Sequence, residues 1–315
     1  MLLSDPVEVE IDGETFGLQH LNRTVDEPSS TKGLFEAAAL MQNKTDFDNL
    51  PRLLEGYRQI GRKLKLYSKI KLIKLAGRKE QIGVILECAR RGKTTNFTLT
   101  HPGVVKELMS WIQGKALASN WTPKQTAQAL RWAEIVSGLL EEPTHRPSNS
   151  HSDVPDVRAL PELLGVMLEL SAVRAVQHLN GKDEDGKVVK YAERLMATSV
   201  DIKPTDVVST FQPSHPYYAN RWLVMAVPVI HGMKTALTVL DPALGVYSRL
   251  ASKLQELELK AATFAAEAEQ RMSNAAEERS PGADETERQA ANTKVPRGLQ
   301  MYSQLLTPLE TVLVA

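Results

Sequence analysis

The chain has 315 residues, of which 38 are lysine or arginine and 38 are aspartate or glutamate. A net charge of zero excludes the basicity over the whole chain that is typical of histone-like proteins and ribosomal core proteins, although a local basic face is still possible. The single cysteine, Cys88, excludes a disulfide scaffold, and the 42% content of hydrophobic residues is that of a globular protein.

Residues 1–30 are predicted to form an N-terminal arm. Val7, Val9 and Ile11 alternate with acidic residues, and Asp12-Gly13 offers a tight turn, so residues 5–19 are expected to form a strand, a short hairpin or an extended arm on a partner. The first 17 residues contain no base, unlike a secretory signal or an arginine-rich transit peptide. From this alone we expect a cytoplasmic or nuclear protein, or a chain without its presequence.

Residues 31–142 are predicted to form a basic helical domain. Apolar residues recur three to four apart, which predicts helices over 33–42, 50–77, 79–91, 102–119 and 123–142, with Gly61 as a candidate break in the second. Pro102 and Pro123 suit the first position of a helix, and Thr122 with Gln125 predicts a capping box.

The second half is predicted to follow a linker at residues 143–156. A second helical region, residues 157–272, comprises helices over 157–179, 187–198 and 219–240 and a long C-terminal helix that starts near Asp241-Pro242. Residues 273–298 have almost no large apolar side chain and are expected to be disordered, whereas residues 299–315 are expected to form a C-terminal helix. The longest apolar run, Trp222 to Ile230, is too short to span a bilayer, so we expect a buried helix and no membrane insertion.

The expected fold class is all-α, with only the short β-like arm at its N-terminus. The helices can be paired as 79–91 with 103–119, 123–142 with 157–179, and 187–198 with 219–240, as in an α-solenoid. Their spacing is irregular and does not match the 34-residue tetratricopeptide pattern. An irregular helical repeat and an irregular helical bundle are therefore both open.

The clearest functional signal is a basic stretch. Residues 52–93 contain thirteen lysines and arginines against three glutamates, a local net charge of +10 in a neutral chain. Such a stretch needs a counter-charge, either a nucleic-acid backbone or an acidic protein surface, unless it is simply a solvated face. Tyr57 and Tyr67 are candidates for stacking on bases. The residues expected to contact RNA or an acidic partner are Arg58, Arg62, Lys63, Lys65, Lys69, Lys71, Lys74, Arg78, Lys79, Arg90, Arg91 and Lys93.

A second candidate surface is a heptad seam on the long helix. Apolar residues recur there at heptad spacing, which suits either packing along the body or pairing with a partner helix. The seam residues are Tyr247, Leu250, Leu254, Leu257 and Phe264.

Catalytic and cofactor motifs are missing from the sequence. The run from Ala89 to Thr95 lacks the first glycine of a phosphate-binding loop, and no pattern of histidines and cysteines suits zinc. We therefore expect no catalytic residues, no metal, no cofactor and no small-molecule substrate, and Cys88 is expected to be a core residue.

Residues Gln81 to Glu142 carry a resemblance to a known class of proteins. Paired helices with a tryptophan near each turn (Trp111, Trp121 and Trp132) follow a basic helix. In this they resemble the degenerate helical-repeat proteins of fungal organelle gene expression, which include accessory proteins of mitochondrial ribosomes. The resemblance implies a non-enzymatic helical protein in an RNA–protein assembly of the mitochondrial matrix, with RNA and other proteins as partners. A protein–protein scaffold that uses residues 244–268, and an unrecognised helical enzyme, are the alternatives.

Overall fold

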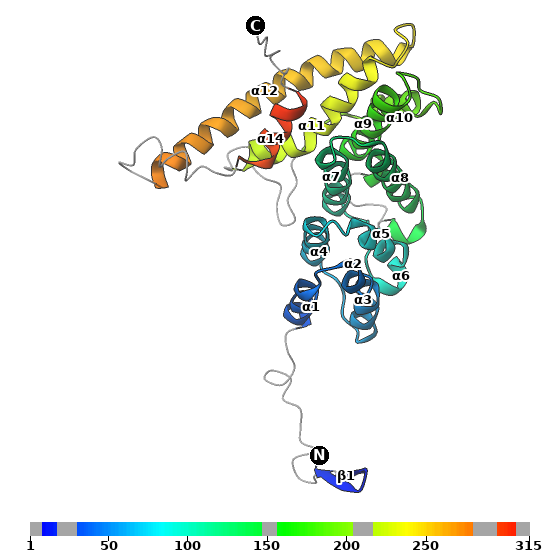
Figure 1. The fold of residues 1–315 in the computed structure, drawn as a ribbon, viewed down its shortest axis with the longest axis vertical. Coiled ribbons are helices and arrows are strands. Elements are labelled where there is room, and N and C mark those ends of the chain that lie inside the picture. Colours follow the sequence, from blue (N-terminus) through cyan, green and yellow to red (C-terminus); the bar gives the residue numbers. More distant parts are fainter. Residues whose placement is uncertain (1–7, 18–29, 147–155, 204–216, 280–294, 307–315) are drawn as a thin grey trace.

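A computed structural model describes residues 8–17, 30–146, 156–203, 217–279 and 295–306. The N-terminal arm contains a β-hairpin of β1 (Glu8–Ile11) and β2 (Glu14–Gly17), with Val9 opposite Phe16. Both turn residues, Asp12 and Gly13, have a positive φ (53° and 85°), as a type I′ turn requires. The predicted hairpin is confirmed, and Figure 1 shows it apart from the helices.

The remaining described elements are helical, as Figure 1 shows. They are α1 (Ser30–Leu40), α2 (Lys44–Phe47), α3 (Leu50–Gln59), α4 (Leu66–Arg78), α5 (Ile82–Arg90), α6 (Gly92–Thr95), α7 (Pro102–Ala118), α8 (Pro123–Leu139), α9 (Pro161–His178), α10 (Lys187–Met196), α11 (Tyr218–Leu237), α12 (Gly245–Arg279) and α14 (Arg297–Leu305), with short 3₁₀ turns at Pro143–His145 and Val157–Ala159. The all-α prediction is confirmed.

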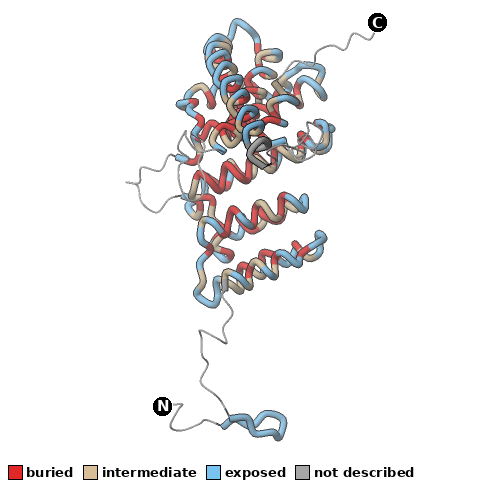
Figure 2. Tube along the Cα trace, turned by 90° about the vertical axis from the view of Figure 1, so that its left-hand side faces the viewer, coloured by how far each residue is buried: buried red, intermediate tan, exposed pale blue. Residues whose placement is uncertain are grey.

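The helices stack as consecutive pairs in two layers. The first layer consists of α1, α4, α7, α9 and α11, each in contact with the next, and the second layer of α3, α5, α8, α10 and α12 covers it. Buried residues lie between the layers along the whole stack (Figure 2). This is a helical repeat, with one continuous apolar core from Leu34 to Met301.

The pairing predicted from the sequence was out of phase by one helix. The pairs of the structure are α1 with α3, α4 with α5, α7 with α8, α9 with α10, and α11 with α12. The first three begin at residues 30, 66 and 102, a spacing of 36 residues. Residues 50–77 are two helices, interrupted at Gly61, whose φ is +78°. Because the prediction treated residues 50–77 as one helix, every later helix was paired with the wrong neighbour. The candidate break at Gly61 is confirmed.

The starts of α7 and α8 show which capping predictions hold. His101 precedes Pro102, and its Nδ1 accepts a hydrogen bond from the backbone N–H of Gly103 (3.0 Å). Thr122 makes no side-chain capping bond at the described start of α8, so the predicted box is wrong. Gln125 instead lines a cavity, and Pro123 alone marks the helix start.

The long helix α12 packs on its own chain. Leu250, Leu254 and Leu257 of the seam are buried, and Phe264 packs against Trp222 of α11 in a tilted arrangement, with ring centroids 4.9 Å apart. The body therefore covers the seam that could have met a partner helix. The helix continues to Arg279, beyond the expected end at Met272, and residues 280–294 of the predicted disordered segment lie outside the described residues.

Helix α11 carries the apolar run Trp222 to Ile230, which is buried as predicted. No helix in the described ranges is both long enough and apolar enough to cross a membrane. Part of the predicted linker is also packed, because His145 is buried and its Nδ1 accepts a hydrogen bond from the N–H of Leu99 (3.1 Å). The division into domains stays a prediction.

Candidate nucleic-acid interface

The predicted basic residues separate into three groups in the structure. One follows helix α4, one lies at the turn between α3 and α4, and one lies at the corner of α5 and α6. Their neighbours differ, and so does the charge that each group leaves for a partner.

The group on α4 consists of Lys71, Lys74 and Arg78. Positions three and four apart lie on one face of a helix, so the three side chains form a stripe. Lys71 is exposed, with its Nζ 4.0 Å from the ring centre of Phe35, and Arg78 is exposed beside a cavity. Lys74 is half-buried and reaches Glu107 of α7, with Nζ 4.0 Å from Oε2.

Lys69 lies on the same helix but does not belong to the stripe. Its side chain is buried, and Nζ donates hydrogen bonds to Oγ1 (2.6 Å) and to the backbone carbonyl (3.1 Å) of Thr98. Burial lowers the pKa of this ammonium from 10.5 to about 8. The assignment of Lys69 to the exposed face is therefore corrected: the chain segment after α6 covers it.

Glu107 gathers cations from distant parts of the chain. Its carboxylate is buried, and Oε2 lies 3.0 Å from Nη2 of Arg221, in addition to Lys74. Its Oε1 accepts a hydrogen bond from the indole N–H of Trp111 (3.0 Å). Arg297 of α14 lies over the ring of Trp111, 5.2 Å from its centre, and donates to the carbonyl of Ser110 (2.9 Å). Burial lowers the pKa of Arg297, and attraction by Glu107 opposes that shift.

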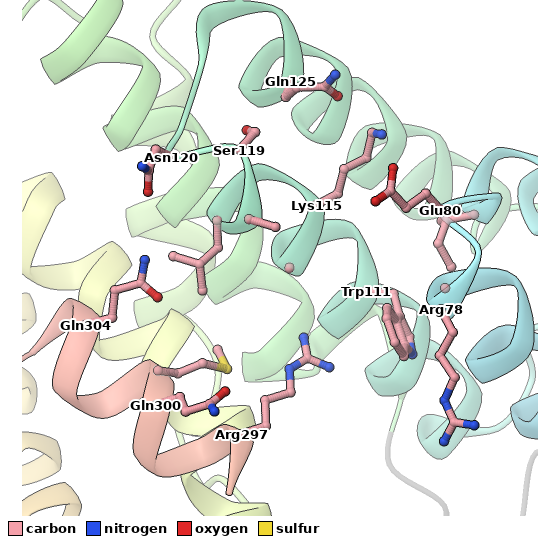
Figure 3. A pocket seen from close by; sticks show the side chains of 16 residues that line it. Arg78, Glu80, Trp111, Lys115, Ser119, Asn120, Gln125, Arg297, Gln300 and Gln304 are labelled. Atoms are coloured by element: carbon pink, nitrogen blue, oxygen red, sulfur yellow. The ribbon is translucent and has the colours of Figure 1, made fainter. Parts of the chain in front are cut away.

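A cavity of about 700 Å³ opens beside this arrangement, between α4, α7 and α14 (Figure 3). Figure 3 shows Arg297, Gln300 and Gln304 lining it from α14. On the opposite wall are Arg78, Trp111, Lys115 and Glu80. Cations, amides and an aromatic ring thus face one opening.

We call these charged residues the first-layer cluster. Among the described residues, it comprises six cations against two carboxylates, a local net charge of +4. Its members are Lys71, Lys74, Arg78, Lys115, Arg221 and Arg297, with Glu80 and Glu107.

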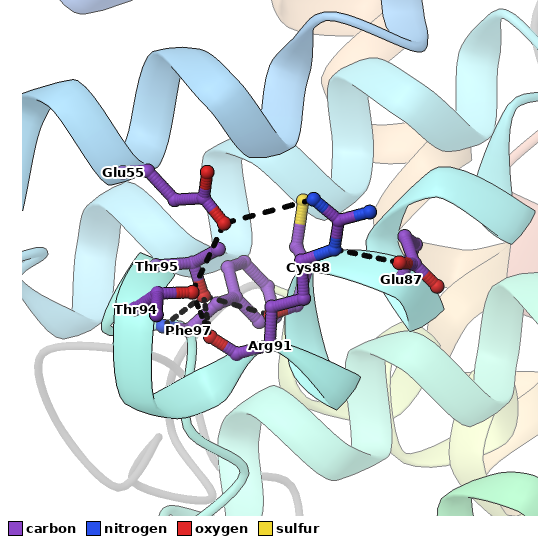
Figure 4. Close-up of polar contacts among 7 residues, drawn as sticks. All are labelled: Glu55, Glu87, Cys88, Arg91, Thr94, Thr95 and Phe97. Atoms are coloured by element: carbon purple, nitrogen blue, oxygen red, sulfur yellow. Dashed lines mark hydrogen bonds and ion pairs between the residues drawn. The ribbon is translucent and has the colours of Figure 1, made fainter.

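The group at α5 and α6 is largely neutralised. Nε of Arg91 lies 2.7 Å from Glu87 Oε1, and its Nη1 lies 3.7 Å from Glu55 (Figure 4). Nη1 of Arg90 lies 3.8 Å from Glu87, while Lys93 is exposed. Two carboxylates thus offset the two arginines.

Cys88 is enclosed beneath this corner, and its backbone carbonyl accepts a hydrogen bond from Oγ1 of Thr95 (2.7 Å). Burial raises the pKa of the Cys88 thiol to about 12, so the sulfur stays protonated at neutral pH. As predicted, Cys88 is a core residue.

The third group surrounds the turn between α3 and α4. Arg58, Lys63 and Lys65 are exposed there, and Arg62 is half-buried. Lys79, at the other end of α4, is exposed and donates to Oε1 of Gln42 (2.6 Å). Of the two candidate stacking rings, Tyr57 packs against the core, whereas Tyr67 is 56% exposed.

The sequence did not point to four residues that the structure places beside the α4 stripe or in the cavity: Trp111, Lys115, Arg221 and Arg297. They come from α7, α11 and α14, far from the basic stretch, and none stands in a charged run. Within the described ranges, no group of three or more histidine, cysteine, aspartate or glutamate side chains is placed to hold a metal ion.

Comparison with known proteins identifies the family of the chain. Residues 1–290 match the model of the family Mrp13, described as mitochondrial ribosomal protein mS27. The chain belongs to the mS27 family. The small ribosomal subunit protein mS27 of Neurospora crassa is 32% identical over 210 residues, which cover 62% of this chain and 53% of the relative. The chain thus matches about half the length of that protein. Membership confirms the resemblance to accessory proteins of mitochondrial ribosomes.

Proposed function

We propose that this chain is a non-enzymatic component of the small subunit of the mitochondrial ribosome, located in the mitochondrial matrix, and that it contacts ribosomal RNA through the first-layer cluster. Membership of the mS27 family supports the assembly. The excess of cations around Glu107 supports the surface.

The proposed RNA contact is supported mainly by the excess of lysine and arginine over glutamate in the first-layer cluster. Lys74 and Arg221 share one buried carboxylate, and the half-buried Arg297, which lines the cavity, lies close by. Lys71 and Arg78 add exposed charge on the same side. Phosphate groups are the natural counter-charge, because each contact with a cation releases condensed counterions.

The test compares two double variants of the full chain that each lose two positive charges. K71Q/R78Q removes exposed members of the first-layer cluster and leaves the pairs around Glu107 intact. R90Q/R91Q is the matched control, because both arginines are offset by Glu55 and Glu87.

The measurement is the affinity for a single-stranded RNA oligonucleotide at several salt concentrations. If about four cations meet phosphates, the log–log slope is about −3, and K71Q/R78Q reduces it by about 1.4. R90Q/R91Q is expected to keep the wild-type slope. Absence of binding at low salt and tens of micromolar protein, or equal slopes for both variants, would overturn the RNA contact.

A further inference from the structure

The N-terminal β-hairpin exposes an apolar face. Val9 and Phe16 are directly opposed across the two strands, so their side chains share a face, and Ile11 lies two positions from Val9 on the same side. Glu14 is opposite Ile11 and places one carboxylate at the turn end of this face. Their exposed fractions are 37%, 47% and 55%. A two-stranded hairpin is at best marginally stable alone in water, so this face needs an apolar surface to pack against.

The charge of the hairpin is opposite to that of the helical cluster. Residues 8–17 contain four carboxylates, on Glu8, Glu10, Asp12 and Glu14, and no base. All of them are exposed. They would repel the phosphates of RNA and of anionic lipids, and they would be attracted to lysine and arginine.

We propose that this hairpin is a docking arm for a second protein, whose surface presents an apolar cleft bordered by lysine or arginine. The inference rests on the proposed function, since the partner would be another protein of the same ribosomal subunit. Val9, Ile11 and Phe16 would enter the cleft, while the carboxylates pair at its rim.

The experiment places a photo-crosslinking amino acid at position 16 of the full chain. The matched control places it at position 15, because Thr15 pairs with Glu10 on the opposite face of the hairpin. Small ribosomal subunits are isolated from mitochondria by sedimentation, irradiated, and the crosslinked peptides and nucleotides are identified.

The expected product joins position 16 to a protein segment that has apolar residues beside an excess of lysine and arginine, with a several-fold lower yield from position 15. Crosslinks to ribosomal RNA, crosslinks to this chain's own helices, equal yields from both positions, or no crosslink from particles that contain the chain would overturn the docking arm alone. Absence of the chain from small-subunit particles would overturn the proposed function and this inference with it.

Discussion

Lys69 belongs to the basic stretch of the sequence but is buried in the structure, and this burial can be tested directly. The side chain is 7% exposed, and its ammonium is held by Thr98. Two histidines, His101 and His145, lie within reach of its charge. Burial lowers the pKa of both imidazoles, and the positive charge of Lys69 lowers them further. Replacement by methionine removes the ammonium and keeps an unbranched side chain of similar length.

The pH dependence has a defined sign. Burial lowers the pKa of Lys69 from 10.5 to about 8, so between these values the folded chain has lost a proton that the unfolded chain retains. Stability from this group therefore rises with pH across that window. At about 1.36 kcal/mol per pH unit, and with most of the change falling between pH 8 and pH 10, the gain in unfolding free energy from pH 7 to pH 10 is roughly 2–3 kcal/mol.

The assay is urea unfolding of the wild type and K69M across that range of pH. The difference in unfolding free energy, wild type minus variant, is expected to shift by roughly 2–3 kcal/mol in favour of the wild type. K71M, on the exposed face of the same helix, is the control for the loss of a lysine from α4. A constant difference for K69M would refute the burial of a charged Lys69.

Two further perturbations probe the core around α11, both by urea unfolding. Trp222 is buried and donates its indole N–H to the carbonyl of Ile202 (3.0 Å), so W222F is expected to cost about 1–3 kcal/mol and W222A about 3–5 kcal/mol; a W222F variant as stable as the wild type would contradict the hydrogen bond, and equal costs for the two variants would contradict the packing of the ring. A methyl group on Gly232 would lie 2.8 Å from the backbone nitrogen of Glu169, so the steric clash in G232A is expected to cost roughly 1–3 kcal/mol. The higher helix propensity of alanine offsets about 1 kcal/mol of that cost. G56A, whose added methyl would meet no atom within 4 Å, is expected to be stabilising by about 0.5–1 kcal/mol, and a G232A variant as stable as G56A would contradict the close approach of α9 and α11.

The elements that the sequence predicted well are those with local signals. Alternation and Asp12-Gly13 identified the hairpin, Gly61 marked the interruption between α3 and α4, and Pro102 marked the start of α7. Each of these features depends on residues close together in the chain, where backbone preferences act directly.

The features that the sequence did not reveal depend on long-range contacts. Lys69 is covered by Thr98, 29 positions later, and Glu107 is reached by Arg221, 114 positions later. Heptad spacing does not indicate whether the seam packs against another chain or against the same chain. The structure shows the second, because Phe264 packs against Trp222 of α11. The basic stretch was found correctly as a charge excess. Its division into open and neutralised groups depends on Glu55 and Glu87, which the fold places beside Arg91, and on Glu107, which it places beside Lys74.

The most direct test of the account is ultraviolet crosslinking of RNA to this chain within intact mitochondrial small subunits. We predict that the chain sediments with the subunit and that its RNA-linked peptides contain α4, the cavity-lining part of α7, or α14. RNA-linked peptides confined to the corner of α5 and α6, or a chain that is absent from the particle, would contradict it.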